Sequence, residues 1–149
     1  MFPNQKPSEA VAVLATLDPV SQGAATVTTG WVAVKNFHAF MALVQTGVLG
    51  TAATVDAKLQ QAQDSGGTGA KDITGKALTQ IVKASGDNKQ AEINLRVAEL
   101  DTENGFGFIR LSLTVGAAAS LISASLLGFH TRYSPASDFN QAAVAQIVG

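Results

Sequence analysis

Cysteine is absent from the 149 residues, which excludes disulfides, thiolate metal sites and cysteine nucleophiles. This absence also fits synthesis in a reducing compartment. Charge is scarce as well, because Asp, Glu, Lys and Arg make up 14% of the chain, against about 25% in a typical soluble domain. The formal net charge is -1 and no basic stripe is present, so we expect no nucleic-acid partner. A surface low in charge and rich in amides and hydroxyls is typical of one that packs against neighbouring proteins.

Segments typical of a signal peptide or a membrane span are also missing. Residues 1–7 contain two prolines and no apolar stretch, so we expect no signal peptide. Residues 111–129 carry no charge, but they include four serines and break at Gly116-Ala117-Ala118. Two buried strands joined by a tight turn explain this stretch better than a spanning helix, and we expect no membrane partner.

Catalytic chemistry is almost as scarce. The two histidines, His38 and His130, are far apart in the sequence, and His38 stands in an apolar strand pattern. The glycine-rich run 69–77 has five residues between its glycines and no hydroxyl after Lys76, so it does not match a phosphate-binding loop. Asp101–Gly105 is read as a turn, with weak cation binding left open. We therefore expect no enzymatic activity and assign no catalytic, cofactor-binding or metal-binding residue.

The pattern that the chain does contain is strict alternation of apolar and polar residues. Residues 91–97 and 55–60 alternate without interruption, as a strand with one buried face does. Segments of this kind recur about every ten residues, with turn residues between them, which predicts an all-β antiparallel sandwich of the jelly-roll type. The expected strands are residues 10–17, 24–28, 31–34, 37–44, 54–63, 72–74, 78–82, 91–100, 106–115 and 120–129.

The domain organisation follows from the same pattern. We expect an extended N-terminal arm over residues 1–9, a sandwich domain over 10–134 and a C-terminal segment over 135–149. Asp138 is placed to cap a short helix over 139–148, with an irregular tail as the alternative. Trp31 suits a core or interface anchor, and a sugar-stacking role for it stays open. The candidate interface residues are Phe2, Pro3, Pro7, Trp31, Phe139, Val144, Ile147 and Val148.

Several runs of the sequence resemble the small β-sandwich head proteins encoded by tailed bacteriophages and prophages. The resemblance extends over residues 10–136 and contains no active-site signature, so it implies no catalytic residues. It implies a capsid decoration (cement) or minor capsid protein, a homotrimer bound to the major capsid protein on the virion surface, assembled in the host cytoplasm. The runs that carry it are Thr54–Ala62, Gly67–Ile73, Gly75–Lys76, Lys89–Gln90, Leu95–Asp101, Phe108–Gly116 and Gly128–Pro135.

Our functional hypothesis from the sequence is a non-enzymatic virion structural protein that stabilises a phage head. Within the same class, the alternative is a head–tail connector or tail component. A carbohydrate-binding β-sandwich module, with Trp31 and loop residues as the ligand platform, is the alternative from another class.

Overall fold

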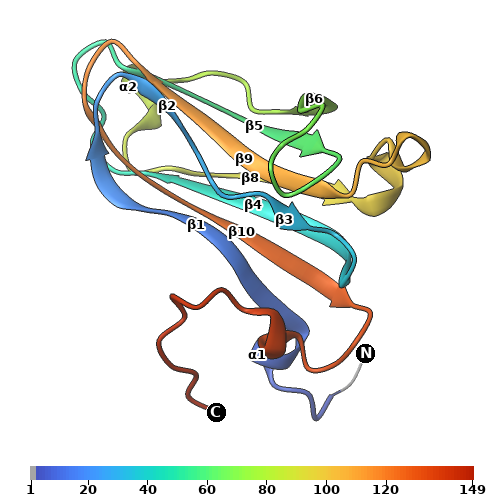
Figure 1. Cartoon of the computed structure of the whole chain (residues 1–149). Helices are drawn as coiled ribbons and strands as arrows, with labels where there is room; N and C mark the ends of the chain where they lie inside the picture. Colours follow the sequence, from blue (N-terminus) through green and yellow to red (C-terminus); the bar gives the residue numbers. More distant parts are fainter. Residues whose placement is uncertain (1–2) are drawn as a thin grey trace.

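Two antiparallel sheets packed face to face form the protein (Figure 1), whose computed structural model describes residues 3–149. The four-stranded sheet has the order β1 (Val11–Gln22), β10 (Ser120–Thr131), β4 (Phe37–Thr46), β8 (Gln90–Arg96). The six-stranded sheet has the order β2 (Ala25–Thr28), β9 (Phe108–Gly116), β5 (Thr54–Ala62), β6 (Lys71–Ala77), with β3 (Val32–Ala33) beside β9 and β7 (Ile81–Val82) beside β5. The prediction of an all-β antiparallel sandwich is confirmed.

Helices are short in this fold. The α-helical turns are α1 (Pro7–Ala10) and α2 (Lys83–Gly86), and the 3-10 turns are η1 (Val97–Glu99), η2 (Thr102–Asn104) and η3 (Ala136–Phe139). In the part of the chain that the structure describes, no helix has the length and apolar character needed to cross a membrane.

The core forms where the alternating side chains of the two sheets meet. On β8, Ile93 and Leu95 are buried while Glu92, Asn94 and Arg96 are exposed, as the alternation predicts. β5 follows the same rule, and the interior consists mainly of Leu, Ile, Val, Phe and Ala side chains. The predicted strand 91–100 is too long, because η1 begins after Arg96. The Glu99 carboxylate accepts the backbone N–H of Arg96 at 2.8 Å and closes that turn.

Two further strand predictions are wrong in detail. Asp18-Pro19 does not end the first strand, because β1 continues to Gln22 with a register shift between Leu17 and Val20. β1 is an edge strand, and a proline is tolerated in an edge strand at such an irregularity because its missing N–H breaks no ladder bond. Residues 37–44 are apolar at nearly every position, which predicts a strand covered on both faces, yet only one face of β4 enters the core.

The C-terminal segment folds back along the free edge of β1. The backbone N–H of Gln141 donates to the Val13 carbonyl at 2.8 Å, and the Asn140 side chain accepts the Val13 N–H at 2.7 Å. These bonds satisfy edge groups that would otherwise be open to another strand. The predicted helix over 139–148 is wrong, because the helical part ends at Phe139, Asn140 and Gln141 bond to Val13, and a turn follows at residues 142–143.

The N-terminal segment lies against the same end of the sandwich. The predicted extended arm over residues 1–9 is wrong at its end, because Pro7–Ala10 form the single turn α1. Proline is at the first position of this turn, and the Glu9 carboxylate accepts the Lys6 N–H at 2.9 Å. α1 packs beside η3, so these two turns lie together below β1 and β10 (Figure 1).

Candidate functional site

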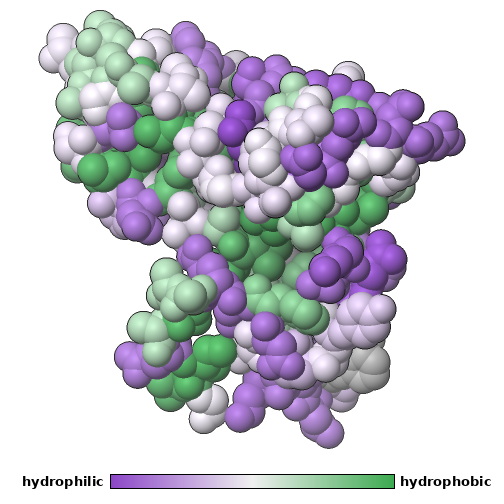
Figure 2. Space-filling view, viewed as in Figure 1, coloured by the Kyte–Doolittle hydropathy of each residue, from purple (hydrophilic) through white to green (hydrophobic). Residues whose placement is uncertain are grey.

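The outer face of the four-stranded sheet carries apolar side chains that the core does not use. Cross-strand register places Leu127 beside Met41 and Phe129 beside Ala39 on this face, while the alternate positions enter the core. Strands β4 and β10 contain no Asp, Glu, Lys or Arg. Figure 2 shows a hydrophobic area over the middle of β1 and β10, bordered by polar surface. We define the outer patch as Val11, Val13, Ala39, Met41, Leu43, Leu127 and Phe129, all of them partly buried and none of them part of the core cluster.

A groove lies at one end of the same sheet and crosses all four strands. It has a volume of about 570 Å³. Two of its apolar side chains remain about half exposed, Val20 at 49% and Leu121 at 47%. None of its lining residues is ionisable. We call it the end groove and define it by Pro19, Val20, Ser21, Gln45, Thr46, Gly47, Asn88, Gln90, Leu121, Ile122 and Ser123.

The end groove has an apolar half and an amide half. Val20 and Leu121 come from neighbouring strands β1 and β10. Gln45 and Gln90 face each other across β4 and β8, and Asn88 precedes β8. The apolar half can bury apolar side chains, and the amides can donate to and accept from backbone or amide groups. This arrangement suits an uncharged segment that carries both kinds of group.

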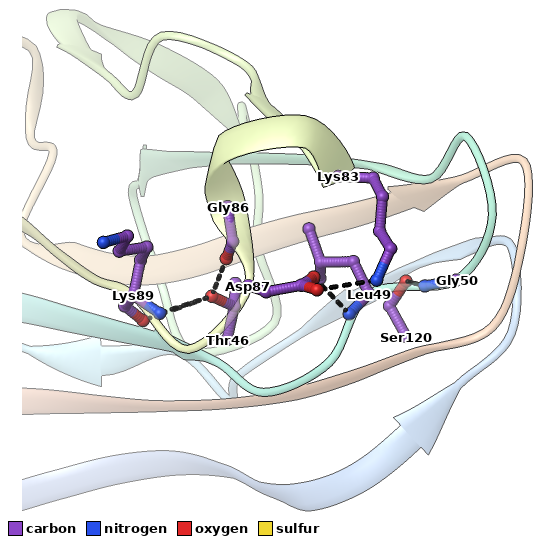
Figure 3. A network of polar contacts seen from close by, with 8 residues as sticks. All are labelled: Thr46, Leu49, Gly50, Lys83, Gly86, Asp87, Lys89 and Ser120. Carbon is purple, nitrogen blue, oxygen red and sulfur yellow. Dashed lines mark hydrogen bonds and ion pairs between the residues drawn. The ribbon is translucent and has the colours of Figure 1, made fainter.

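A polar network fixes the loops behind the end groove (Figure 3). The Thr46 hydroxyl donates to the Gly86 carbonyl and accepts the Lys89 N–H at 3.1 Å, which ties the end of β4 to the loop before β8. The Gly50 N–H donates to the Ser120 hydroxyl at 3.0 Å, which ties the loop after β4 to the start of β10. The loop geometry at the groove therefore exists before any ligand binds.

Asp87 is the centre of this network. Its carboxylate accepts the Leu49 N–H at 2.9 Å and pairs with the Lys83 ammonium at 2.6 Å. The hydrogen bond from Lys83, followed by the one from Leu49, lowers the pKa of Asp87. Gly86 permits the tight turn, because a Cβ there would lie 2.4 Å from the Ile81 side chain.

A second hollow, of about 470 Å³, lies toward the other end of the same sheet and differs in charge. It contains Arg96 and Lys76 at its rim and Phe129 and Met41 in its apolar part. Lys76 pairs with Glu99 at 2.9 Å. The Arg96 N–H, and then Lys76, lower the pKa of the Glu99 carboxyl. The Glu99 carboxylate is thus already bonded to Arg96 and Lys76.

The structure does not bring the residues predicted from the sequence together into one site. Trp31 lies immediately before β3 of the six-stranded sheet, and the Arg110 guanidinium sits 4.4 Å from its ring centroid, over one face of the ring. A sugar could not stack on that face without displacing Arg110. Gly67 also approaches the Trp31 ring, where a Cβ would lie 2.6 Å from Nε1.

The candidate residues of the two termini differ in how far they are buried. Phe139 packs on the core and meets Phe37 edge-on, with ring centroids 5.7 Å apart. Ile147 and Val148 project into solvent, with 48% and 89% of their surface exposed. Val144 is partly buried, Pro3 and Pro7 are exposed, and Phe2 lies outside the described residues.

The end groove was not predicted from the sequence. Its exposed apolar members stand in short segments that mix apolar and polar residues, Asp18–Gln22 around Val20 and Ser120–Ser123 around Leu121. Neither segment shows by itself which residues of distant strands lie beside it, so the groove appears only once the strands are paired.

Acidic and histidine side chains do not assemble into a metal site anywhere in residues 3–149. Asp101, the candidate for weak cation binding, pairs with Lys71 at 2.6 Å and accepts a hydrogen bond from Asn104. These bonds, with that of Lys71 first, lower the pKa of Asp101. His38 is exposed on β4, and His130 is exposed at the end of β10 with a left-handed φ of 53°.

Comparisons with known proteins give only distant structural similarities. No family model matches the chain, and no curated protein matches it. The SPBc2 prophage-derived protein YomS is similar over 79% of this chain and 91% of its own, with 6% identity and a TM-score of 0.47. A non-crystalline cellulose specific carbohydrate-binding module, CBM28, is similar over 79% and 73%, with 8% identity and a TM-score of 0.48. The CBM22-2 xylan-binding domain from Paenibacillus barcinonensis Xyn10C is similar over 83% and 89%, with 10% identity and a TM-score of 0.44. At these values the similarities assign no function to the chain.

Proposed function

We propose that the chain is a non-enzymatic structural protein of a tailed-phage head, a decoration protein that binds the shell through the outer patch. The observation that carries the proposal is the uncharged, partly exposed apolar surface on β4 and β10, which the protein's own core does not cover. Contiguous apolar surface bordered by polar residues is typical of sites where a protein contacts another protein. The resemblance in sequence supplies the kind of partner, the major capsid protein.

The repeated symmetry of a capsid allows a weak contact of this kind to hold the protein on the shell. Fully burying a large apolar side chain stabilises a complex by about 1.5–3 kcal/mol, and the patch side chains are already partly buried. Each patch residue therefore adds about 1 kcal/mol or less, which is weak for a single site. On a shell with many copies of the same contact, linked copies bind together and the overall affinity rises steeply. The proposal includes a homotrimer, for which light scattering should give three times the chain mass of 15.3 kDa.

Carbohydrate binding has less support from the same surfaces. The end groove contains no aromatic ring on which a sugar could stack. Trp31, the ring considered for that role, is covered on one face by Arg110. A head–tail connector or tail protein would use the same kind of protein contact, and the test below separates these cases by the particle part that binds.

The test is cosedimentation with purified empty heads and, in parallel, with purified tails. Leu43→Lys places a charge in the patch opposite Glu92, its cross-strand partner, so the fold tolerates the new ammonium group. Thr114→Lys is the matched control, because it places the same charge opposite Asp56 on the six-stranded sheet. We expect wild type and the control to sediment with heads and Leu43→Lys to remain in solution. Binding to tails alone would move the protein to the alternative role, and equal head binding by both variants would contradict the patch assignment.

A further inference from the structure

The end groove leaves apolar surface unburied, although its loops are fixed. Val20 and Leu121 each keep nearly half of their surface exposed. Because the groove contains no charge to pair, an occupant that is itself uncharged binds there without the cost of burying an ion.

This chain carries a segment with the complementary properties. Val144–Val148 contains no charged residue, and its last two side chains are exposed. The N–H of Val144 donates to the Gln141 carbonyl at 3.1 Å, and within residues 3–149 no backbone hydrogen bond involves residues 145–149. The segment is thus anchored at Gln141 and then leaves its own domain's hydrogen bonding.

The segment also matches the end groove in length and in the order of its polar and apolar residues. Four extended steps from Val144 to Val148 span about 14 Å, and three spacings between four neighbouring strands span about 14 Å. Gln146 is followed by Ile147 and Val148, an amide next to an apolar pair. In an extended segment, Gln146 and Val148 point to the same side and Ile147 to the other. A segment lying across the strands therefore places Gln146 over the amide half of the groove and Val148 over its apolar half.

The segment does not fill the groove of its own copy. Its anchor pairs with Val13, at the opposite end of β1 from Val20. From there the segment runs away from the groove, and Gly149 ends beside the Lys6 side chain (Figure 1). Because the groove and the segment lie apart on one molecule, the segment of one molecule can fill only the groove of another.

We propose that Val144–Val148 of one copy occupies the end groove of a second copy. Such a contact joins two different surfaces, so it closes into a ring or continues as a chain of copies. The inference goes beyond the proposed function, because it names the two surfaces through which copies of the chain contact each other and needs no phage head.

Disulfide trapping tests the contact directly, since the chain contains no cysteine that could interfere. A Val20→Cys chain is mixed under mild oxidation with a Val148→Cys chain that carries a mass tag. Val82→Cys replaces Val20→Cys as the control, because Val82 is 40% exposed but lies on the six-stranded sheet. We expect the mixed disulfide to form at least tenfold faster with Val20→Cys than with the control. Equal rates would overturn the proposal, as would a Val20→Cys/Val148→Cys double variant that links only within one chain.

Light scattering on full-length charge variants gives an independent readout. We expect Leu121→Lys alone and Val148→Asp alone to weaken self-association at least tenfold. A mixture of the two should recover it, because the unaltered segment of Leu121→Lys fits the unaltered groove of Val148→Asp and the two altered surfaces form an ion pair. Recovery in the mixture would not follow from misfolding of either variant. Self-association unchanged in both single variants would overturn the proposal. Leu43→Lys separates the two ideas, because we expect it to lose head binding and keep the disulfide trap.

Discussion

Replacing Phe139 by alanine tests whether this ring stabilises the core of its own domain or only provides a contact for another protein. Its ring packs on the core and meets the Phe37 ring edge-on at 5.7 Å. Phe→Ala changes at fully buried sites cost about 3–5 kcal/mol. Phe139 is only partly buried, but it also loses an aromatic pair, so we expect a cost of about 2–3 kcal/mol.

Thermal unfolding of the isolated protein measures this cost. For a chain of this length, 1 kcal/mol corresponds to about 2–4 °C, so the Tm should fall by about 4–12 °C. Val48→Ala is the control, because Val48 is 53% exposed in the loop after β4 and its truncation should change the Tm by no more than about 2 °C. If both variants have the Tm of the wild type, the Phe139 ring does not stabilise the fold and the C-terminal segment is not anchored as described.

Three further predictions concern single contacts. Gly128→Ala would place a Cβ 2.9 Å from three atoms of the Phe37 ring, which is 1% exposed. Denaturant unfolding should therefore show a free energy of unfolding lower by about 1–3 kcal/mol. An unchanged free energy of unfolding would show that the ring can move aside. Asp87 has a lowered pKa, so its stabilising effect is present above about pH 4 and is lost as the pH falls through the lower folded pKa. Asp87→Asn should therefore lose less stability than the wild type between pH 5 and pH 3, and parallel pH profiles would refute this. Trp31 is the single tryptophan, so its fluorescence should shift to the red in Arg110→Ala as water reaches the ring, and an unchanged spectrum would contradict the stacked geometry.

Alternation in the sequence predicted most of the sandwich, because burial on one face imposes a period of two whatever the partner strand is. β8 shows the rule at its clearest, with Ile93 and Leu95 inside and their neighbours outside. Strand ends were harder to predict, since they depend on contacts made elsewhere. Pro19 looks like a stop in the sequence, yet β1 passes it because an edge strand can bulge there.

The C-terminal segment shows the same limit. Asp138 and the apolar residues after it fit a helix, but the edge of β1 offers Asn140 and Gln141 backbone and side-chain partners that a helix would not reach. Local propensity is weak compared with such tertiary contacts. The pairing of distant strands, which no single segment contains, also assembles the end groove: it sets Ser21 opposite Leu121 and Gln45 opposite Gln90.

An image of the native particle tests the central claim most directly. A reconstruction at side-chain detail should show the protein on the outside of the head, with Met41, Leu43 and Leu127 of the outer patch covered by a neighbouring capsid protein. Density absent from the head, or an outer patch that faces solvent in every copy, would contradict the account.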